Sequence, residues 1–264
     1  MDIAQDLSVL KEFFILVVSL FSNLFSALSG GGAGLIQLPA LLFLGIPYYQ
    51  ALALHKAATV ALGVGGSIRN FSELRDDYRL IFQLLIIGIP GVIIGSSLVK
   101  TLPEDYLYFL LGVFSILIGS YSLSKPNFGL NSISKEITLF INIRFSILIF
   151  AIAILNGSIS SGTGLLVTLL LIKTFGIDFL RSIRITFLAV GIFWNAFGAL
   201  ALIREGSIPI NILFILLFGS LLGGFAGAHL SNLKGNTLIK KSFTIICFLI
   251  GLTLVIKSLG KIFI

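Results

Sequence analysis

The chain has 264 residues, of which 57% are apolar and only 11% are charged. Soluble domains carry about 25% charged residues, so this composition excludes a water-soluble globular domain and a disordered chain. The 18 basic residues are scattered singly between apolar runs, a pattern that argues against nucleic acid as a partner. The composition predicts an all-α polytopic membrane protein whose surroundings are the lipid bilayer.

The first apolar run is predicted to stay in the protein as a membrane span. The chain opens with Asp2 and Asp6 instead of a basic region, and no small-residue cleavage site follows the run. It therefore lacks the pattern of a cleavable signal.

Ten apolar segments follow one another along the chain. A helix that spans the hydrocarbon core needs about 20 apolar residues, and the second and seventh segments are shorter than this. Each of these two follows a glycine-rich break, at residues 29–34 and 157–164. The ten segments lie near residues 12–28, 35–47, 50–69, 80–99, 105–123, 143–158, 165–176, 182–203, 208–230 and 242–260.

The two breaks mark an internal repeat. With a shift of 130 residues, Gly32-Ala33-Gly34-Leu35 falls on Gly162-Thr163-Gly164-Leu165. The polar stretch at residues 124–135 has the composition of a connection. We predict two repeats of about five helical segments each, at residues 1–125 and 140–264, joined by a linker at 126–139.

Basic residues near the ends of the segments predict the orientation of the repeats, because such residues prefer the cytoplasmic side. Apart from Lys56, which lies inside a segment, 17 basic residues remain. They divide 12 to 5 if all ten segments cross the membrane, and 10 to 7 if the short segments re-enter without crossing. The stronger asymmetry favours five crossings per repeat, hence inverted repeats with both termini outside. We expect the membrane to be the plasma or inner membrane of a prokaryotic cell. Eight crossings are the alternative.

Inverted repeats with interrupted helices are typical of secondary transporters. Irregular backbone at membrane depth is tolerated where it lines a cavity, and a helix that begins there offers free N–H groups to an anion. We predict that the short helices meet at the midplane and bind a small anion. The binding residues predicted from the breaks are Ser29, Gly30, Gly31, Gly32, Gly34, Ser160, Ser161, Gly162, Thr163 and Gly164. The alternative is that these glycines only allow close helix packing.

A few side chains inside the segments extend this predicted site. A lysine in the membrane core costs roughly 2.5–3.5 kcal/mol, and all eleven acidic residues lie outside the segment cores. We predict His55, Lys56, Thr59 and Arg184 as further ligands of the anion. The alternatives are that Lys56 extends to the membrane surface and that Arg184 anchors the cytoplasmic end of its segment.

Other chemistries lack their patterns. No Gly-Lys-Ser/Thr follows the glycine breaks, as a phosphate loop requires, and no His, Cys, Asp or Glu cluster has metal-ligand spacing. An enzyme that used Ser29, Ser160 or Ser161 as nucleophile would need a carboxylate to orient His55, and the segments contain none. We predict no catalytic residue, no metal, no cofactor and no enzymatic activity.

Residues 29–71 carry a family resemblance. They read SGGGAGLIQLPALLFLGIPYYQALALHKAATVALGVGGSIRNF, which resembles the first-repeat signature of the sulfite exporter TauE/SafE family. Gly31, Gly32, Gly34, Pro39 and Lys56 fall on the family pattern. The sequence departs from it at two positions, with His55 where Asn is usual and Leu54 where Thr or Ser is common. The second break also carries fewer glycines than the family usually shows.

The resemblance implies a transporter of small sulfur-containing anions. We therefore expect a secondary transporter, acting as an exporter, that binds sulfite or an organosulfonate between the two breaks. A passive anion channel and a transporter of small carboxylates are the alternatives. The sequence leaves open whether the protein forms a homo-oligomer.

Overall fold

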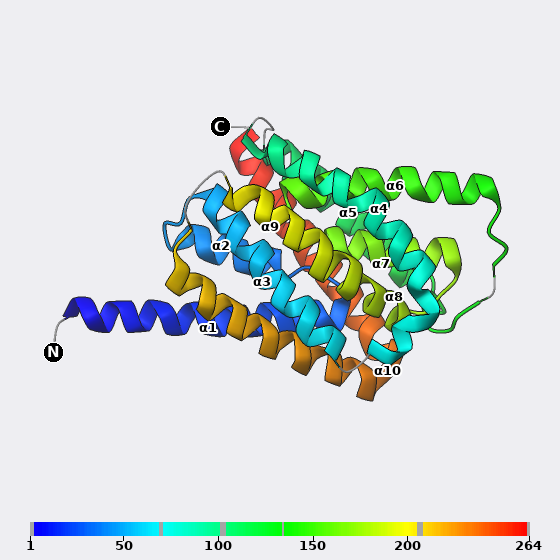
Figure 1. Cartoon of the computed structure of the whole chain (residues 1–264), viewed down its shortest axis with the longest axis horizontal. Helices are drawn as coiled ribbons and strands as arrows, with labels where there is room; N and C mark the ends of the chain where they lie inside the picture. Colours follow the sequence, from blue (N-terminus) through cyan, green and yellow to red (C-terminus); the bar gives the residue numbers. More distant parts are fainter. Residues whose placement is uncertain (1–2, 69–70, 101–103, 134, 205–207, 263–264) are drawn as a thin grey trace.

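The computed structural model describes residues 3–68, 71–100, 104–133, 135–204 and 208–262. Throughout these residues the regular structure is helical. Figure 1 shows most of the helices running roughly along the long axis of the molecule. Six stretches are long and apolar enough to cross a membrane: Val9–Ser29, Tyr48–Ile68, Glu73–Ser97, Leu139–Ser158, Phe179–Ile203 and Ile210–Leu259. The prediction of an all-α multi-pass membrane protein is confirmed.

The first half of the chain forms five main helices. They are α1 (Ile3–Ser29), α2 (Gly34–Phe43), α3 (Tyr48–Ile68), α4 (Tyr78–Ser97) and α5 (Glu104–Ser124), with short 3₁₀ turns η1 (Phe71–Asp77) and η2 (Leu98–Lys100) on either side of α4.

The second half repeats the same succession of long and short helices. It comprises α6 (Leu139–Ser158), α7 (Thr163–Phe175), the continuous run α8 (Phe179–Thr186), η3 (Phe187–Trp194) and α9 (Asn195–Ile203), and α10 (Ile210–Ile262). The backbone of α10 is non-helical at Gly235, where φ is 68° and ψ is −170°. The bend divides α10 into the two segments that the sequence predicts there.

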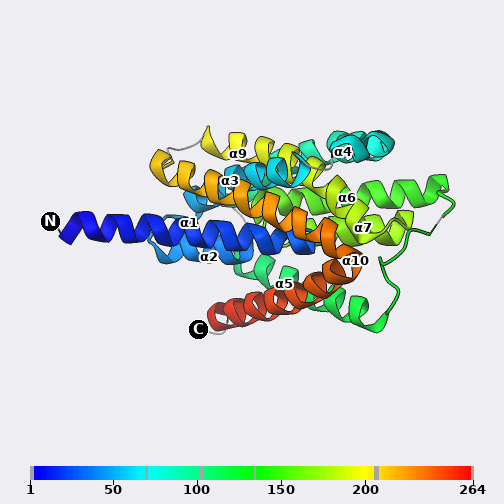
Figure 2. The same ribbon diagram turned by 90° about the horizontal axis from the view of Figure 1, so that it is seen from below.

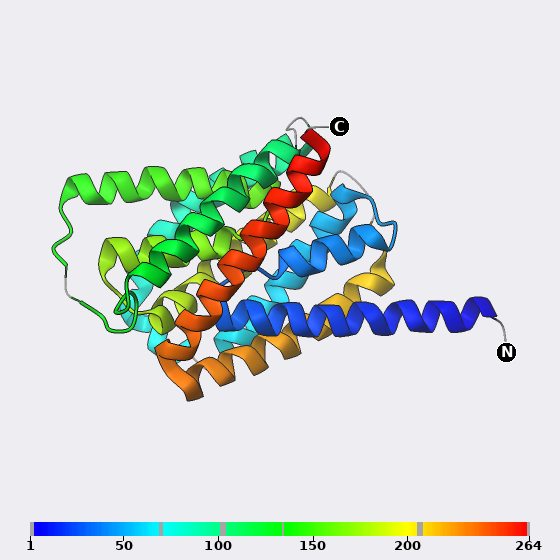
Figure 3. The same cartoon turned by 180° about the vertical axis from the view of Figure 1, so that it is seen from behind.

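The short helices α2 and α7 turn back beside the long helices that precede them. Their 10 and 13 residues make about 15 and 20 Å of helix, less than the core thickness of about 30 Å. Figures 1 and 3 show α2 running back beside α1, and α7 running back toward the linker from which α6 starts. The linker contacts the end of α7, since Ile133 N donates to Gly176 O at 2.7 Å. The lengths and directions of α2 and α7 favour the alternative in which the short segments re-enter without crossing.

Backbone geometry at the breaks explains the reversals. Gly30, Gly31 and Gly32 all have positive φ, and Ser160 and Gly162 have φ of 63° and 77°. Helical residues have φ near −63°, so these residues end α1 and α6 and redirect the chain. The pairs α1–α2 and α6–α7 are hairpins, each with a break as its turn.

Glycines also set the spacing between the long helices. The first part of α10 runs beside α1 (Figure 2), and it presents Gly219, Gly223 and Gly227 at four-residue intervals. A Cβ added at Gly223 would lie 2.3 Å from Leu20 O, and one at Gly227 2.5 Å from Leu24 O. Small residues at this spacing let two helix backbones approach closely.

A buried tryptophan locks α4 against the second half. The Trp194 side chain is fully buried, and its Nε1–H donates to Leu84 O at 3.0 Å. A Cβ added at Gly88 would lie 2.0 Å from the indole ring. The ring therefore occupies the space that the absence of a side chain at Gly88 leaves.

We predict that Gly88→Ala destabilises the protein by about 1–3 kcal/mol, because the new methyl group overlaps a ring that packing and a hydrogen bond hold in place. The melting temperature of the detergent-solubilised protein measures this. Ile86→Ala on the same helix is the control, since Ile86 is exposed on the surface of the bundle. Equal melting temperatures for the Gly88 variant and the wild type would contradict the packing described.

Candidate functional site

The two breaks lie against each other in the interior. Thr168 Oγ1 of α7 donates to Gly30 O at 3.3 Å. A Cβ added at Gly31 would lie 2.8 Å from Leu165 N, and one added at Gly164 would lie 3.0 Å from Gly30 O. Backbone thus meets backbone, and larger residues at Gly31 or Gly164 would push the hairpins apart. Close packing and a binding role are both compatible with this contact.

A small cavity of about 40 Å³ opens where the breaks meet α3 and the α8–η3–α9 run. On this scale a water molecule needs about 10–15 Å³, so the cavity has room for a few waters or one small ion. The residues that line it are Ser26, Gly30, Gly31, Gly32, Ala33, Gly34, His55, Thr59, Leu62, Asn156, Ser160, Gly162, Thr163, Gly164, Thr186, Phe187, Val190, Gly191 and Asn195. Most of the predicted ligands are among them.

A π-helical stretch forms one wall of the cavity. Residues of η3 have π-helix geometry, which often marks functional sites because it displaces part of a helix from its regular course. Within it Gly191 touches α3, and a Cβ added at Gly63 would lie 2.8 Å from Gly191 C. The side chain of Asn195 donates to Val190 O at 2.7 Å and so satisfies a carbonyl group of the π-helix.

His55 faces the cavity in a defined tautomer. Its Nδ1 lies 2.7 Å from Oε1 of Gln37, and the amide nitrogen of Gln37 donates to Ser19 Oγ at 3.2 Å. Because Gln37 thereby offers an oxygen to the ring, we assign the proton to Nδ1. The other ring nitrogen, Nε2, then carries no proton and lies 3.5 Å from Thr59 Oγ1, whose hydroxyl donates to His55 O at 2.8 Å.

Lys56 lies behind the cavity wall. Its side chain is fully buried, so it does not extend to the surface. Its Nζ donates to Asn156 O at 2.7 Å and to Asn156 Oδ1 at 3.2 Å. These oxygens belong to the last turn of α6, where the helix dipole places negative charge. The lysine therefore compensates the carbonyl end of α6.

Asn156 connects Lys56 to the second break. Its Nδ2 donates to Thr163 Oγ1 at 2.8 Å, and Thr163 Oγ1 donates to Ser160 O at 2.7 Å. Asn156 lines the cavity, whereas Lys56 does not. Asn156 and Ser26 were not among the predicted ligands, although a polar amide in an apolar run, as at Asn156, is a usable signal of an interior contact.

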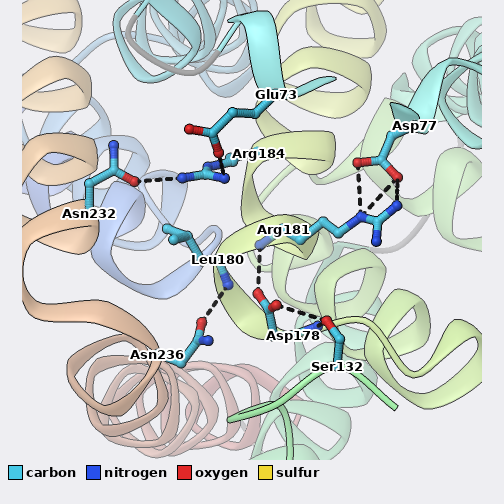
Figure 4. A network of polar contacts seen from close by, with 9 residues as sticks. All are labelled: Glu73, Asp77, Ser132, Asp178, Leu180, Arg181, Arg184, Asn232 and Asn236. Carbon is cyan, nitrogen blue, oxygen red and sulfur yellow. Dashed lines mark hydrogen bonds and ion pairs between the residues drawn. The ribbon is translucent and has the colours of Figure 1, made fainter. Parts of the chain in front are cut away.

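Three other predicted ligands lie outside the cavity lining. Ser29 Oγ lies 2.9 Å from Phe25 O and 2.7 Å from Gly31 O, so its one hydroxyl proton serves carbonyl groups at the end of α1. Ser161 is buried beside Gly34, where an added Cβ would lie 2.4 Å from Ser161 Oγ. Arg184 lies between Glu73 and Asn232 (Figure 4). Ser160 remains in the lining and donates to Asn195 Oδ1 at 3.3 Å.

Metal chemistry has no ligand set in the described part of the chain, where no group of three or more His, Cys, Asp or Glu residues could hold an ion. The cavity instead offers backbone groups, hydroxyls, amides and one imidazole. Such a lining can bind a small polar solute by hydrogen bonds.

Comparison with known proteins identifies relatives over the whole length. A model of the family described as "Sulfite exporter TauE/SafE" matches residues 15–254. The chain is 27% identical to a "Probable membrane transporter protein" of Haemophilus influenzae over 94% of both chains. It is also 27% identical to "Probable membrane transporter protein ORF9" of a Sinorhizobium species, over 95% of this chain and 94% of the relative. No solved structure matches the chain.

We predict that Gly30→Ala lowers the melting temperature more than Gly45→Ala does. Gly30 and Gly45 have φ of 84° and 79°, so both substitutions introduce the same left-handed strain of roughly 1–2 kcal/mol. A Cβ at Gly30 would also lie 2.8 Å from Thr168 Oγ1 and from Ile183 Cγ1, whereas one at Gly45 meets nothing within 4 Å. Equal losses for the two variants would mean that the contact between the breaks adds no stability.

Proposed function

The chain belongs to the sulfite exporter TauE/SafE family of membrane transporters, and from this premise we propose that it exports a small anion, sulfite or an organosulfonate, through the cavity between the two breaks. The substrate class comes from the family description and from the chemistry of the cavity. The direction of transport comes from the family description alone.

The observation that most supports an anionic substrate is the charge balance of the interior. Lys56 is fully buried, and its described hydrogen bonds go to two neutral oxygens of Asn156. Both ion pairs in the described part of the chain involve other residues, so no carboxylate is paired with Lys56 there. An ammonium group in a medium of low dielectric constant favours an anion nearby. The cavity, one residue away across Asn156, is where such an anion would lie.

The helix ends support the same proposal. Neither α2 nor α7 has a side chain that caps its N-terminus, and both helices begin at the cavity. Some of their first N–H groups donate to carbonyl groups of the breaks, such as Leu35 N to Gly32 O and Leu165 N to Gly162 O, both at 3.1 Å. The positive dipole ends of the helices would still attract an anion. Lys56 compensates the opposite, negative end of α6, so the balance of partial charges around the cavity is positive.

The arrangement of the halves supports inverted repeats. In Figure 1, α1 runs away from the N-terminus toward the interior, and α6 runs toward the interior from the opposite end. If the α1–α2 and α6–α7 hairpins each enter and leave on the same side, each half keeps three crossings. These are α3, α4 and α5 in the first half, and the α8–η3–α9 run and the two parts of α10 in the second. This number is odd, so the repeats remain inverted and the termini share one side.

The loops keep the sides that the charge count gives them. Lys240 donates to Lys125 O, and Lys135 donates to Lys173 O, so several basic segments gather at the linker end. We propose that the linker end faces the cytoplasm, in accordance with the preference of basic residues.

Anion-dependent thermal stabilisation of the purified protein tests the proposal. We expect sulfite or a sulfonate such as sulfoacetate to raise the melting temperature as its concentration exceeds the dissociation constant. Lys56→Gln should abolish this effect, whereas Lys135→Gln, which removes an exposed charge, should not. Stabilisation by acetate or lactate alone would replace sulfonates by carboxylates as the substrate. Flux without saturation or counter-substrate exchange would indicate a channel.

Asn156→Asp gives a second, opposite test. The new carboxylate would lie within hydrogen-bond distance of Lys56 Nζ, so it would neutralise the lysine and place negative charge in the cavity wall. We expect the unliganded protein to stay folded, with a melting temperature near that of the wild type, and anion binding to be lost. Undiminished binding of sulfite by this variant would contradict an anion site governed by Lys56.

A further inference from the structure

Two ion pairs join the halves of the protein at the linker end of the cavity. Arg181 and Arg184 of α8 pair with Asp77 and Glu73 of η1 (Figure 4). Asp178 caps the same helix, accepting from Arg181 N at 2.9 Å. The N-terminal turns of α8 are thus bound to a segment of the first half.

Three hydrogen bonds hold the Arg181–Asp77 ion pair together. Arg181 donates to Asp77 through Nε at 3.0 and 3.1 Å and through Nη2 at 2.7 Å. The carboxylate is buried and the guanidinium is 43% exposed. A two-pronged pair with a buried carboxylate of this kind is a fixed structural contact.

In the Arg184–Glu73 ion pair, the arginine is the more buried partner and the carboxylate the more exposed one. Here the arginine side chain is 16% exposed and its partner Glu73 is 52% exposed. Nη1 donates to Glu73, and Nη2 donates to Asn232 Oδ1 at 3.1 Å. Arg184 Nε is buried and has no hydrogen-bond partner within the described residues. A largely buried cation is therefore held by a carboxylate on a solvated side chain.

Arg184 lies next to the cavity along its own helix. Residues three apart on a helix lie on the same face, so Arg184 precedes Phe187 by about one turn. Phe187 lines the cavity, as does Thr186. The Phe187 ring contacts α3, since a Cβ added at Gly66 would lie 2.5 Å from it. Phe187 is thus a cavity residue about one helical turn from Arg184.

We propose that Arg184 is a second anion site at the linker-side mouth of the cavity, and that Glu73 occupies it while the mouth is closed. This inference rests on the proposed function and adds a second binding site to the path of the anion. The substrate replaces the Glu73 carboxylate on Arg184 before it passes Phe187. The Arg181–Asp77 pair stays intact and keeps α8 attached to η1.

A free anion and the Glu73 carboxylate can exchange on Arg184 because both offer the same kind of oxygen atoms. A guanidinium binds carboxylate, sulfite or sulfonate oxygens by the same charge-assisted hydrogen bonds. A carboxylate tethered close to the site competes at a high effective concentration. Removing that competitor while keeping the arginine should therefore strengthen binding of a free anion.

Sulfite titrations of the whole purified protein, followed by thermal stabilisation, test this inference. We expect Glu73→Gln to lower the half-maximal sulfite concentration on the order of tenfold. The double variant Glu73→Gln/Arg184→Gln should lose this gain. Asp77→Asn is the matched control, since it makes the same charge change in the same segment and frees the more exposed Arg181. Asp76→Asn, at an exposed carboxylate, serves if the Asp77 variant does not fold.

The outcomes separate this inference from the proposed function. An unchanged midpoint in Glu73→Gln, with sulfite still binding to the wild type, would overturn the second site alone. Equal gains in Glu73→Gln and in the control would show a general effect of net charge and would also overturn it. If no anion stabilised any of the variants or the wild type, both the second site and the proposed function would be wrong.

Discussion

The contact between the two breaks is the constraint on which the rest of the structure depends. Two hairpins whose turns lie in the interior can bury those turns against each other, because exposed backbone is costly in lipid. Gly31 and Gly164 allow this contact, since a Cβ at either would meet backbone atoms of the other hairpin at 3.0 Å or less. The long helices then surround the contact. The cavity is the space that the irregular backbone of the two turns leaves unfilled.

The same contact creates an electrostatic imbalance that the side chains partly correct. At each turn the carbonyl end of one helix and the N–H end of the next come together. Lys56 compensates the carbonyl end of α6, and the Ser29 hydroxyl donates to carbonyl groups at the end of α1. The N–H ends of α2 and α7 have no capping side chain. In the proposed function, these dipole ends and the buried Lys56 would together attract an anion.

Much of this arrangement was predictable from the sequence. Apolar runs gave the ten helical segments, because burial in lipid requires long apolar stretches, and the glycine runs gave the position of the breaks. The reversal of the chain was not predictable, because it depends on the φ values of Gly30, Gly31 and Gly162. Nor was the partner of Lys56, since Asn156 lies 100 residues away and no local spacing indicates it. Arg184 was selected for its charge, but its contact with Glu73 depends on how α8 packs against η1.

Different forces join the helices at the two ends of the bundle. At the linker end, both ion pairs of the described residues join the halves. At the other end, Tyr49 of α3 donates a hydrogen bond to Leu202 O of α9, a neutral contact among apolar neighbours. Anions in solution compete with ion pairs, but they do not compete with apolar packing or neutral hydrogen bonds. A ligand shifts a conformational equilibrium only through its different affinity for the two states. For the proposed exporter, an anion that arrives from the linker side would bind the two states with different affinity. In the closed state Glu73 occupies the guanidinium of Arg184, whereas in the open state the anion can bind it. Substrate would thus favour opening on its own side, and the opposite end would open only through rearrangement of the helices.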